Sequence, residues 1–209
     1  MQGKLAFDIP EIKDRESVTL RAVLTDKVGE VIHYTEEKLE IFPRFEACAP
    51  TATVASGMDF LREQEKYEAL AEGGATVVIE ALPEGKHIIA GKEVTVKACG
   101  MRALLFVSRK TGHELVRGFE PYDFRYWYDE REDMITPILR TTFLAEGATP
   151  ILTSGNSLRG SAWGQKLYSA LACAEMPVGR GKIIINQVDL ISHITNPAAK
   201  NFADRLYSY

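Results

Sequence analysis

The stretch Lys182-Ile-Ile-Ile-Asn-Gln-Val-Asp-Leu190 decides the fold class, because it is the continuous apolar run of a central, fully buried strand. The turn Gly179-Arg-Gly181 leads into it. A second run, over residues 75–82, contains Thr76-Val-Val-Ile79, and β-branched side chains in such a row are also typical of a buried strand. Together the two runs predict an α/β layer structure.

Helix and strand patterns alternate around these two runs. Ser56 can cap a helix that begins near Met58 and ends at Gly73-Gly74. Asn196-Pro197 is a good cap and first-turn pair for a last helix, whose apolar stripe is formed by Ala199, Phe202, Leu206 and Tyr209. Further strands are expected at residues 51–55, 93–98, 102–108, 138–144 and 149–153, while residues 167–176 fit a strand or a short helix.

The beginning of the chain follows a different pattern. Apolar and polar side chains alternate over residues 17–26, and the turn Asp26-Lys-Val-Gly29 leads into a second strand over residues 30–42. So few strands bury too little surface to be stable on their own. We therefore expect them to be the closing strands of an upstream β-sandwich. The sequence therefore divides into a partial β-sandwich (1–43), a linker (44–50) and an α/β domain (51–209).

Composition excludes several classes of function. Of the 209 residues 45% are hydrophobic, which is enough for a sizeable core, and the net charge is −4. An acidic balance argues against nucleic-acid binding, and the apolar runs are too short to cross a bilayer, so we expect neither partner. The three cysteines form no CxxC pair and the four histidines no i, i+4 pair, so no metal and no other cofactor is expected.

Four segments resemble a known family. They are Phe106-Val-Ser-Arg-Lys-Thr-Gly-His-Glu-Leu115, Pro121-Tyr-Asp-Phe-Arg-Tyr-Trp-Tyr-Asp129, Ile151-Leu-Thr-Ser-Gly-Asn156 and the run from Gly179 to Leu190. They resemble the C-terminal region of family 2 glycoside hydrolases, which are β-galactosidase-like and β-glucuronidase-like enzymes, mostly of gut bacteria. The resemblance implies a flavodoxin-like, class I glutamine amidotransferase-like three-layer domain, also used for trimerisation in family 42 β-galactosidases. It also implies that the N-terminal strands close an immunoglobulin-like sandwich.

For function, the resemblance implies a non-catalytic accessory domain of a glycosidase. Carboxylates are present between Asp123 and Asp133, but the family's chemistry resides in a (β/α)8 barrel of about 200 residues or more, for which this chain has too few elements. No catalytic residue is therefore expected. The expected partners are the upstream catalytic and β-sandwich domains of the parent enzyme, with a second copy of the chain or a carbohydrate as alternatives. For the parent we consider a periplasmic or secreted location in a bacterium.

Cys99 is the best candidate for an amidotransferase-type nucleophile. It is followed by a glycine, but no glycine lies two residues before it, and His193 lacks an adjacent carboxylate. We interpret Cys99 as a packed thiol and His193 as a loop histidine. A Cys99-dependent amidohydrolase remains an alternative function.

Four aromatic residues are the candidates for contact with a carbohydrate or an interface: Tyr126, Trp127, Tyr128 and Trp163. If the first three lie in an extended segment, Phe124, Tyr126 and Tyr128 share one face and Trp127 lies on the other. An exposed tryptophan can stack on a sugar ring or anchor an interface, whereas a buried one packs in the core. All three interpretations stay open, and a carbohydrate-binding module is the main alternative function.

Overall fold

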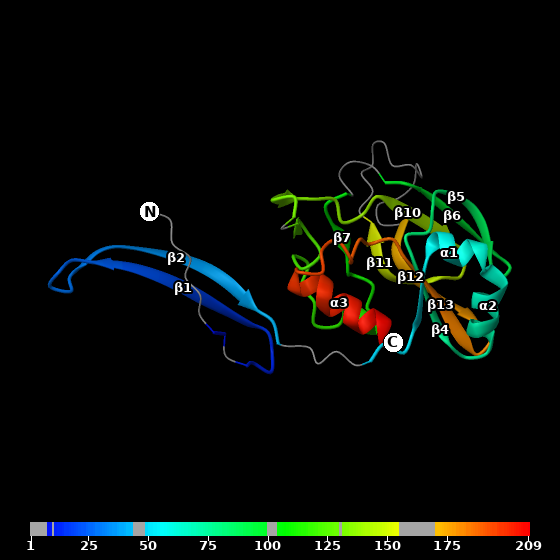
Figure 1. Ribbon diagram of the computed structural model, residues 1–209, viewed down its shortest axis with the longest axis horizontal. Coiled ribbons are helices and arrows are strands. Elements are labelled where there is room, and N and C mark those ends of the chain that lie inside the picture. The colour runs from blue at the N-terminus through cyan, green and yellow to red at the C-terminus, as the bar shows by residue number, and fades with distance from the viewer. Residues whose placement is uncertain (1–7, 10, 44–48, 100–103, 130, 155–169) are drawn as a thin grey trace. The chain divides into compact units, whose positions relative to one another are not determined.

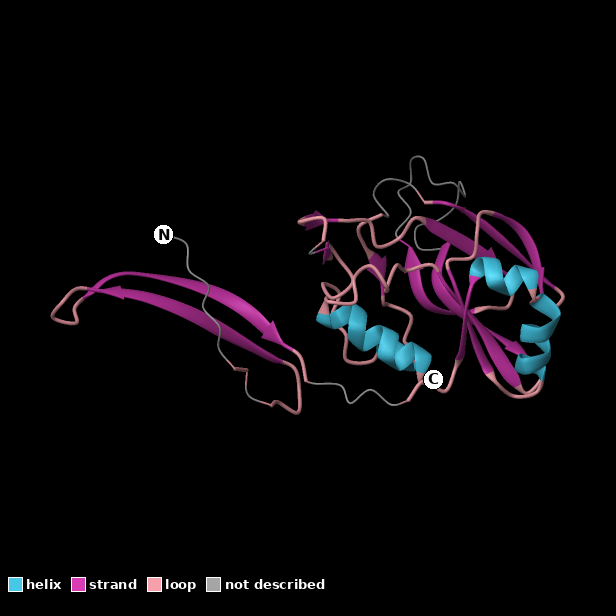
Figure 2. Cartoon of the chain, in the orientation of Figure 1, coloured by secondary structure: helices cyan, strands magenta, loops and turns pink. Residues whose placement is uncertain are grey.

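The computed structural model describes residues 8–9, 11–43, 49–99, 104–129, 131–154 and 170–209. These residues fall into two units, Met1–Glu46 and Ala47–Tyr209, which are described separately (Figure 1). Mixed strands and helices make up the second unit, as the sequence predicted, and strands predominate over helices (Figure 2).

The first unit contains an antiparallel hairpin of β1 (Glu16–Thr25) and β2 (Val31–Ile41). Its turn is closed by Asp26, whose Oδ1 accepts hydrogen bonds from the backbone N–H groups of Val28 and Glu30, both at 2.9 Å. Nearly all of its side chains are exposed. The predicted strands are thus confirmed, while their place in a larger β-sandwich stays a prediction.

The centre of the second unit is a row of three parallel strands. The order is β3 (Thr53–Ser56), β4 (Thr76–Glu80) and β13 (Gly181–Asn186). Both apolar runs identified in the sequence therefore form buried, neighbouring strands. Their side chains are buried on both faces of the sheet, as continuous apolar runs require.

Beyond β13 the sheet continues with antiparallel strands, in the order β12, β10, β6 and β5. β11 pairs with β12 and with β7, and a separate short hairpin joins β8 to β9. The bounds are β5 (Gly85–Ile89), β6 (Lys92–Ala98), β7 (Val107–Ser108), β8 (Tyr128–Asp129), β9 (Met134–Ile135), β10 (Thr141–Ala145), β11 (Thr149–Ser154) and β12 (Ala170–Val178). With only three strands paired in parallel among the described residues, the expected flavodoxin-like arrangement is not confirmed.

Three α-helices and one 3-10 helix lie in the described part of the chain: α1 (Gly57–Arg62), α2 (Gln64–Glu72), η2 (Glu114–Val116) and α3 (Pro197–Tyr207). Both predicted caps are present, because Ser56 accepts from the N–H of Asp59 and Asn196 from those of Ala198 and Ala199. The first helix, expected as one, divides at Glu63, whose backbone is not helical. None of the described helices is long and apolar enough to span a bilayer.

Residues of the helices belong to the apolar clusters on both faces of the parallel strands, and the sheet itself is open and curled (Figure 1). Val77 and Ile79 of β4 pack with Phe60 of α1 on one face. Val78 packs with Phe202 of α3 on the other face. The alternation of β4 thus divides the core into two apolar clusters on opposite faces of the sheet.

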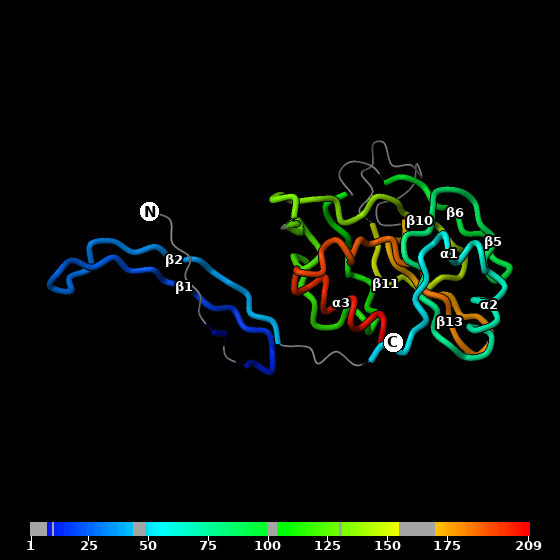
Figure 3. The backbone as a smooth tube through the Cα atoms, viewed as in Figure 1, coloured from blue at the N-terminus to red at the C-terminus, as the bar shows by residue number. Residues whose placement is uncertain are grey.

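The two ends of the second unit lie side by side (Figure 3). The carbonyl oxygen of Tyr207 accepts hydrogen bonds from the backbone N–H groups of Thr51 and Ala52, both at 3.0 Å. In addition, the Thr76 hydroxyl donates to the carbonyl of Tyr209 at 3.4 Å. These contacts fix the C-terminal end of α3 beside the beginning of the unit.

Candidate functional site

The carboxyl ends of the parallel strands are the first place to look for a site, because α/β proteins bind ligands there. β4 ends at Glu80 and β13 ends at Asn186, and the two residues are partners in the register of the sheet. Ser56, at the end of β3, is the partner of Glu80 on the other side. Three polar side chains therefore belong to one edge of the sheet.

Glu80 is the centre of a buried hydrogen-bond network. Nδ2 of Asn186 donates to Oε2 of Glu80 at 2.7 Å, and the hydroxyl of Tyr207 in α3 donates to Oε1 at 3.1 Å. The Asn186 side chain also bonds to the backbone of Val188. The Val188 N–H donates to Oδ1 of Asn186, and the Val188 carbonyl accepts from its Nδ2. Glu80 is 9% exposed and Asn186 fully buried, so the chain itself occupies both oxygens of the carboxyl group.

Burial raises the pKa of Glu80 to about 7, although the hydrogen bonds from Asn186 and Tyr207 act in the opposite direction. The nearby Asp189 raises it a little further. Burial and the charge of Glu80 also raise the pKa of the Tyr207 hydroxyl, which stays protonated. Glu80 therefore holds a proton over part of the neutral range, and it belongs to a network that ties α3 to the sheet.

The two described cysteines are poor nucleophiles. Cys99 donates its thiol to the carbonyl of Leu139 at 3.2 Å, and burial raises its pKa to about 11. Cys173 is fully buried in β12, which raises its pKa well above the usual range. Because the thiolate is the reactive form, both side chains are in unreactive surroundings. Cys48 lies outside the described residues.

His193 is buried and has a partner at each ring nitrogen. Nδ1 lies 2.8 Å from the carbonyl oxygen of Asp189, and Nε2 lies 2.8 Å from the hydroxyl of Thr136. Its ring packs against Trp127, with the centroids 5.4 Å apart. These contacts orient the imidazole for packing. Within the described ranges, no three His, Cys, Asp or Glu side chains are grouped so that they could hold a metal ion.

Trp127 is a core residue. Its side chain is 1% exposed, and its Nε1 donates to the carbonyl of Asp123 at 2.6 Å. The indole packs against Phe124, with ring centroids 6.0 Å apart, in the cluster that α3 covers. Of the three interpretations, burial therefore favours core packing, since no face of this ring is open for a sugar to stack on.

The other aromatic candidates are placed differently. Tyr126 and Tyr128 are 57% and 45% exposed, and Trp163 lies outside the described residues. The expectation that Phe124, Tyr126 and Tyr128 share one face is wrong, because Phe124 is fully buried. The physical reason is the backbone of Tyr126, whose φ of 52° is left-handed and interrupts the extended segment.

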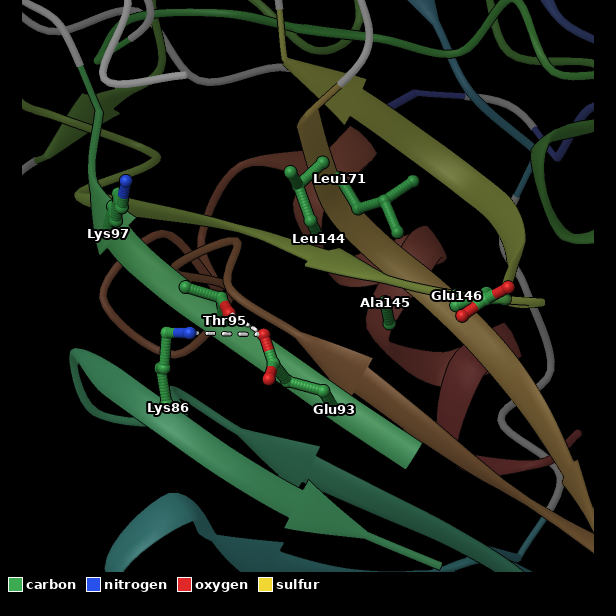
Figure 4. Close-up of a pocket in the computed structure, with 9 residues that line it drawn as sticks. Lys86, Glu93, Thr95, Lys97, Leu144, Ala145, Glu146 and Leu171 are labelled. Atoms are coloured by element: carbon green, nitrogen blue, oxygen red, sulfur yellow. Dashed lines mark hydrogen bonds and ion pairs between the residues drawn. The ribbon is translucent and has the colours of Figure 1, made fainter. Parts of the chain in front are cut away.

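A broad pocket of about 820 Å³ opens over β5, β6 and β10 (Figure 4). Lys86 and Glu93 point toward one another there, with Nζ and Oε1 3.4 Å apart, and the Thr95 hydroxyl donates to the same oxygen at 3.2 Å. Leu144 and Leu171 supply part of its apolar lining. Two lysines and two glutamates line this pocket, so its charges balance and it favours neither anions nor cations. Sequence reasoning missed it, because strand β5 was not predicted.

No protein-family model matches the chain. No curated protein matches it by sequence. Among solved structures, it is similar to the cold-adapted β-galactosidase of Rahnella sp. R3, with 12% identity, a TM-score of 0.39 and 77% of the chain covered. It is also similar to the β-galactosidase of Bacillus circulans sp. alkalophilus, with 10% identity, a TM-score of 0.39 and 75% of the chain covered. The chain spans only 21% and 22% of the lengths of these two enzymes.

A further similar structure is that of the cytoplasmic protein STM1381 from Salmonella typhimurium LT2. It shares 11% identity with the chain at a TM-score of 0.39, and the match covers 92% of this chain and 96% of that one. All three are distant likenesses of fold, and the activity of the β-galactosidases is not transferred to this chain by them.

Proposed function

We propose that this chain is a non-catalytic accessory part of a β-galactosidase-like glycoside hydrolase, and that it supports the catalytic barrel or the assembly of subunits. In this proposal the second unit is a degenerate class I glutamine amidotransferase-like domain of flavodoxin-like ancestry. The four sequence segments that resemble family 2 enzymes motivate the glycosidase assignment. The geometry of the sheet edge supports the non-catalytic role.

The closed network around Glu80 is the observation that carries the proposal. A hydrolase needs a reactive group within reach of a substrate, together with a partner that moves its proton. At the carboxyl ends of β4 and β13 the only described carboxyl group with a raised pKa has both oxygens bonded to Asn186 and Tyr207. This arrangement holds α3 on the sheet and leaves Glu80 no free oxygen for a substrate.

The hairpin of the first unit supports an architectural role as well. Val18, Leu20, Ala22 and Leu24 of β1 share one face, and Leu39 of β2 lies opposite Val18. Leu20 and Leu24 are 43% and 58% exposed. A two-stranded hairpin with an exposed apolar face is at best marginally stable, so we propose that this face packs against the other strands of the parent's β-sandwich.

The opposite face of the hairpin carries an ion pair as well as the exposed side chains of Val23 and Tyr34. Arg21 Nε lies 3.4 Å from Oε1 of Glu36, and its guanidinium group lies 4.2 Å from the centre of the Tyr34 ring. Ion pairs of this exposed kind suit a solvent-facing surface. The two faces of β1 therefore differ in the way expected of a strand that closes a sandwich, whereas β2 places Glu37 and Thr35 beside the apolar row.

Assays on the full chain test the non-catalytic role. We expect no hydrolysis of p-nitrophenyl β-galactoside, p-nitrophenyl β-glucuronide or glutamine above a blank, and no retention on insoluble glycans. Hydrolysis that is lost in Glu80→Gln or Cys99→Ala would overturn the proposal. Retention on a glycan without hydrolysis would instead establish the carbohydrate-binding module.

Sedimentation velocity tests the apolar hairpin face. Without its sandwich partner, the face should cause self-association that increases with protein concentration. The double substitution Leu20→Lys with Leu24→Lys should abolish it, because it places two charges in the contact. Thr19→Lys on the opposite face is the matched control and should leave association unchanged. Equal behaviour of all three proteins would contradict an architectural role for this face.

A further inference from the structure

Two of the segments that resemble the glycosidase family meet in space and form a second pocket. Phe106 and Arg125 form an antiparallel bridge. On either side of it, the N–H of Val107 donates to the carbonyl of Phe124 at 3.1 Å, and the N–H of Tyr126 donates to the carbonyl of Leu105 at 2.9 Å. A pocket of about 360 Å³ lies beside this pairing, within the size range of small-molecule sites. The proposed architectural role makes no use of it.

The charge of this pocket is positive, although the chain as a whole carries −4. Arg109, Lys110 and Arg125 all line it, and no Asp or Glu is among the described residues that do. Glu120 contacts one of these cations, with its Oε2 3.4 Å from a terminal nitrogen of Arg109. Like charges brought together in a concave surface raise the local concentration of an anion.

Short contacts hold the turn that carries Arg109 and Lys110. The backbone N–H of Lys110 donates to the hydroxyl of Ser108 at 3.3 Å. The hydroxyl of Thr111 donates to the carbonyl of Ile151 at 2.9 Å, which anchors the turn on β11. The two cations therefore project from a turn whose backbone is fixed in advance, and this reduces the entropy lost when a ligand is bound.

Arg125 is held by aromatic rings. Its guanidinium carbon lies 5.7 Å from the centre of the Phe106 ring and 5.3 Å from that of Tyr122. Stacking of this kind leaves the edge of the guanidinium group, with its N–H donors, directed away from the rings. Arg125 thus adds a third positioned cation from the second segment.

Arg109 supplies the most specific observation. Its Nε is buried and has no hydrogen-bond partner among the residues that the structure describes. Buried N–H groups normally have an acceptor, and the N–H groups of a guanidinium fork match the two oxygens of an oxyanion. Nε is closed off from solvent in the unbound chain, so a ligand oxygen reaches this donor only when the guanidinium group shifts.

We infer that this pocket binds a small molecule through an oxyanion group, which is a carboxylate, a sulfate or a phosphate. Arg109 and Lys110 bind the oxyanion group, and Arg125 adds to the positive charge of the pocket. The inference does not depend on the glycosidase assignment, since it rests only on the pocket and its charges.

Isothermal titration of the full chain at constant ionic strength tests the inference. The probes are sodium glucuronate, inorganic sulfate and inorganic phosphate, with glucose as the uncharged counterpart of glucuronate. Saturable binding of at least one anion, and weaker or no binding of glucose, is the expected result. The anion that binds most tightly separates a sugar acid from a sulfated or phosphorylated ligand.

Substitutions locate the binding. Arg109→Gln and Lys110→Gln should each weaken the anion by about tenfold or more, because each removes a charge-assisted hydrogen bond. Lys86→Gln, in the other pocket, is the matched control and should have no effect. Lys110 is exposed, so its variant keeps the test valid if Arg109→Gln does not fold. Failure of all three anions to bind, equal binding of glucose, or binding that both variants retain would overturn the inference.

Discussion

Asn186 and Glu80 end two neighbouring parallel strands, and the amide of the first donates to the carboxyl group of the second at 2.7 Å inside the domain. Neither side chain would be stable there alone, because a buried polar group without a partner costs about 1–3 kcal/mol. Tyr207 joins them from α3. The three side chains therefore form one buried network that links the C-terminal helix to the sheet, around a carboxyl group whose pKa burial raises to about 7.

Stability should fall as the pH rises through the range between 4.5 and about 7. Those values are the ordinary pKa of a glutamate carboxyl and its raised pKa at Glu80 in the folded chain, so the folded state binds the extra proton between them. This contribution is complete below pH 4.5 and is lost by about pH 7. Its upper limit is about 3 kcal/mol. Urea unfolding at a series of pH values measures it.

The Glu80→Gln variant is expected to lose this part of the pH dependence, since the amide does not titrate. Glu65→Gln, an exposed substitution in α2, is the matched control and should keep the slope of the original chain. A Glu80→Gln profile that runs parallel to that of the original chain between pH 5 and 8 would show that this carboxyl group is not the cause.

Trp127→Ala should lower the free energy of unfolding by about 3–5 kcal/mol, because it removes a fully buried ring from the core. Tyr126→Ala, at an exposed neighbour, should change it by about 0.5 kcal/mol or less. Denaturant unfolding followed by circular dichroism compares the two. A change of less than about 1 kcal/mol in the free energy of unfolding for Trp127→Ala would contradict core packing and support a surface binding role.

Native-state labelling of Cys99 and Cys173 should be slow at neutral pH. Burial raises the pKa of both thiols, so very little thiolate is present. The measurement is the rate of reaction with a disulfide reagent in a Cys48→Ser background, with and without urea. Rapid labelling of Cys99 without urea would instead support the nucleophile interpretation.

Gly181→Ala should be strongly destabilising, by about 3 kcal/mol or more, because overpacking against backbone cannot relax easily. A Cβ at this position would lie 2.2 Å from the carbonyl oxygen of Ala75 and 2.6 Å from that of Ala71. Gly91→Ala is a useful comparison, since its Cβ would meet no atom within 4 Å and only its φ of 75° opposes the change. Melting temperatures of equal value would contradict the tight approach of α2 to β13.

The sequence alone predicted the elements whose cause is local. The apolar runs around Val78 and Ile184 appeared as buried strands, and the caps Ser56 and Asn196 marked helix starts that the structure confirms. The strand over residues 93–98 was predicted, but its hairpin partner β5 was not, because the turn between them was not recognised. The turn is Ala90-Gly91, in which both residues have a positive φ (48° and 75°), and alanine stands where the strong Asn-Gly turn signal would have asparagine.

The candidate network around Glu80 was beyond sequence reasoning for a different reason. A glutamate at the end of an apolar run normally indicates the surface, where carboxylates are hydrated. Its partners are Asn186 and Tyr207, which follow it by 106 and 127 positions in the chain. Only the parallel pairing of β4 with β13 and the packing of α3 bring these side chains together, and no pattern over a short window encodes such contacts.

The carbonyl of Tyr207 that accepts from both Thr51 and Ala52 has a consequence for engineering. Because Thr51 and Tyr207 lie beside each other near the two ends of the second unit, a short peptide can join these ends, and the chain can be opened at another surface loop. The unit is therefore suited to circular permutation, and equally to insertion as a cassette into a loop of a host protein.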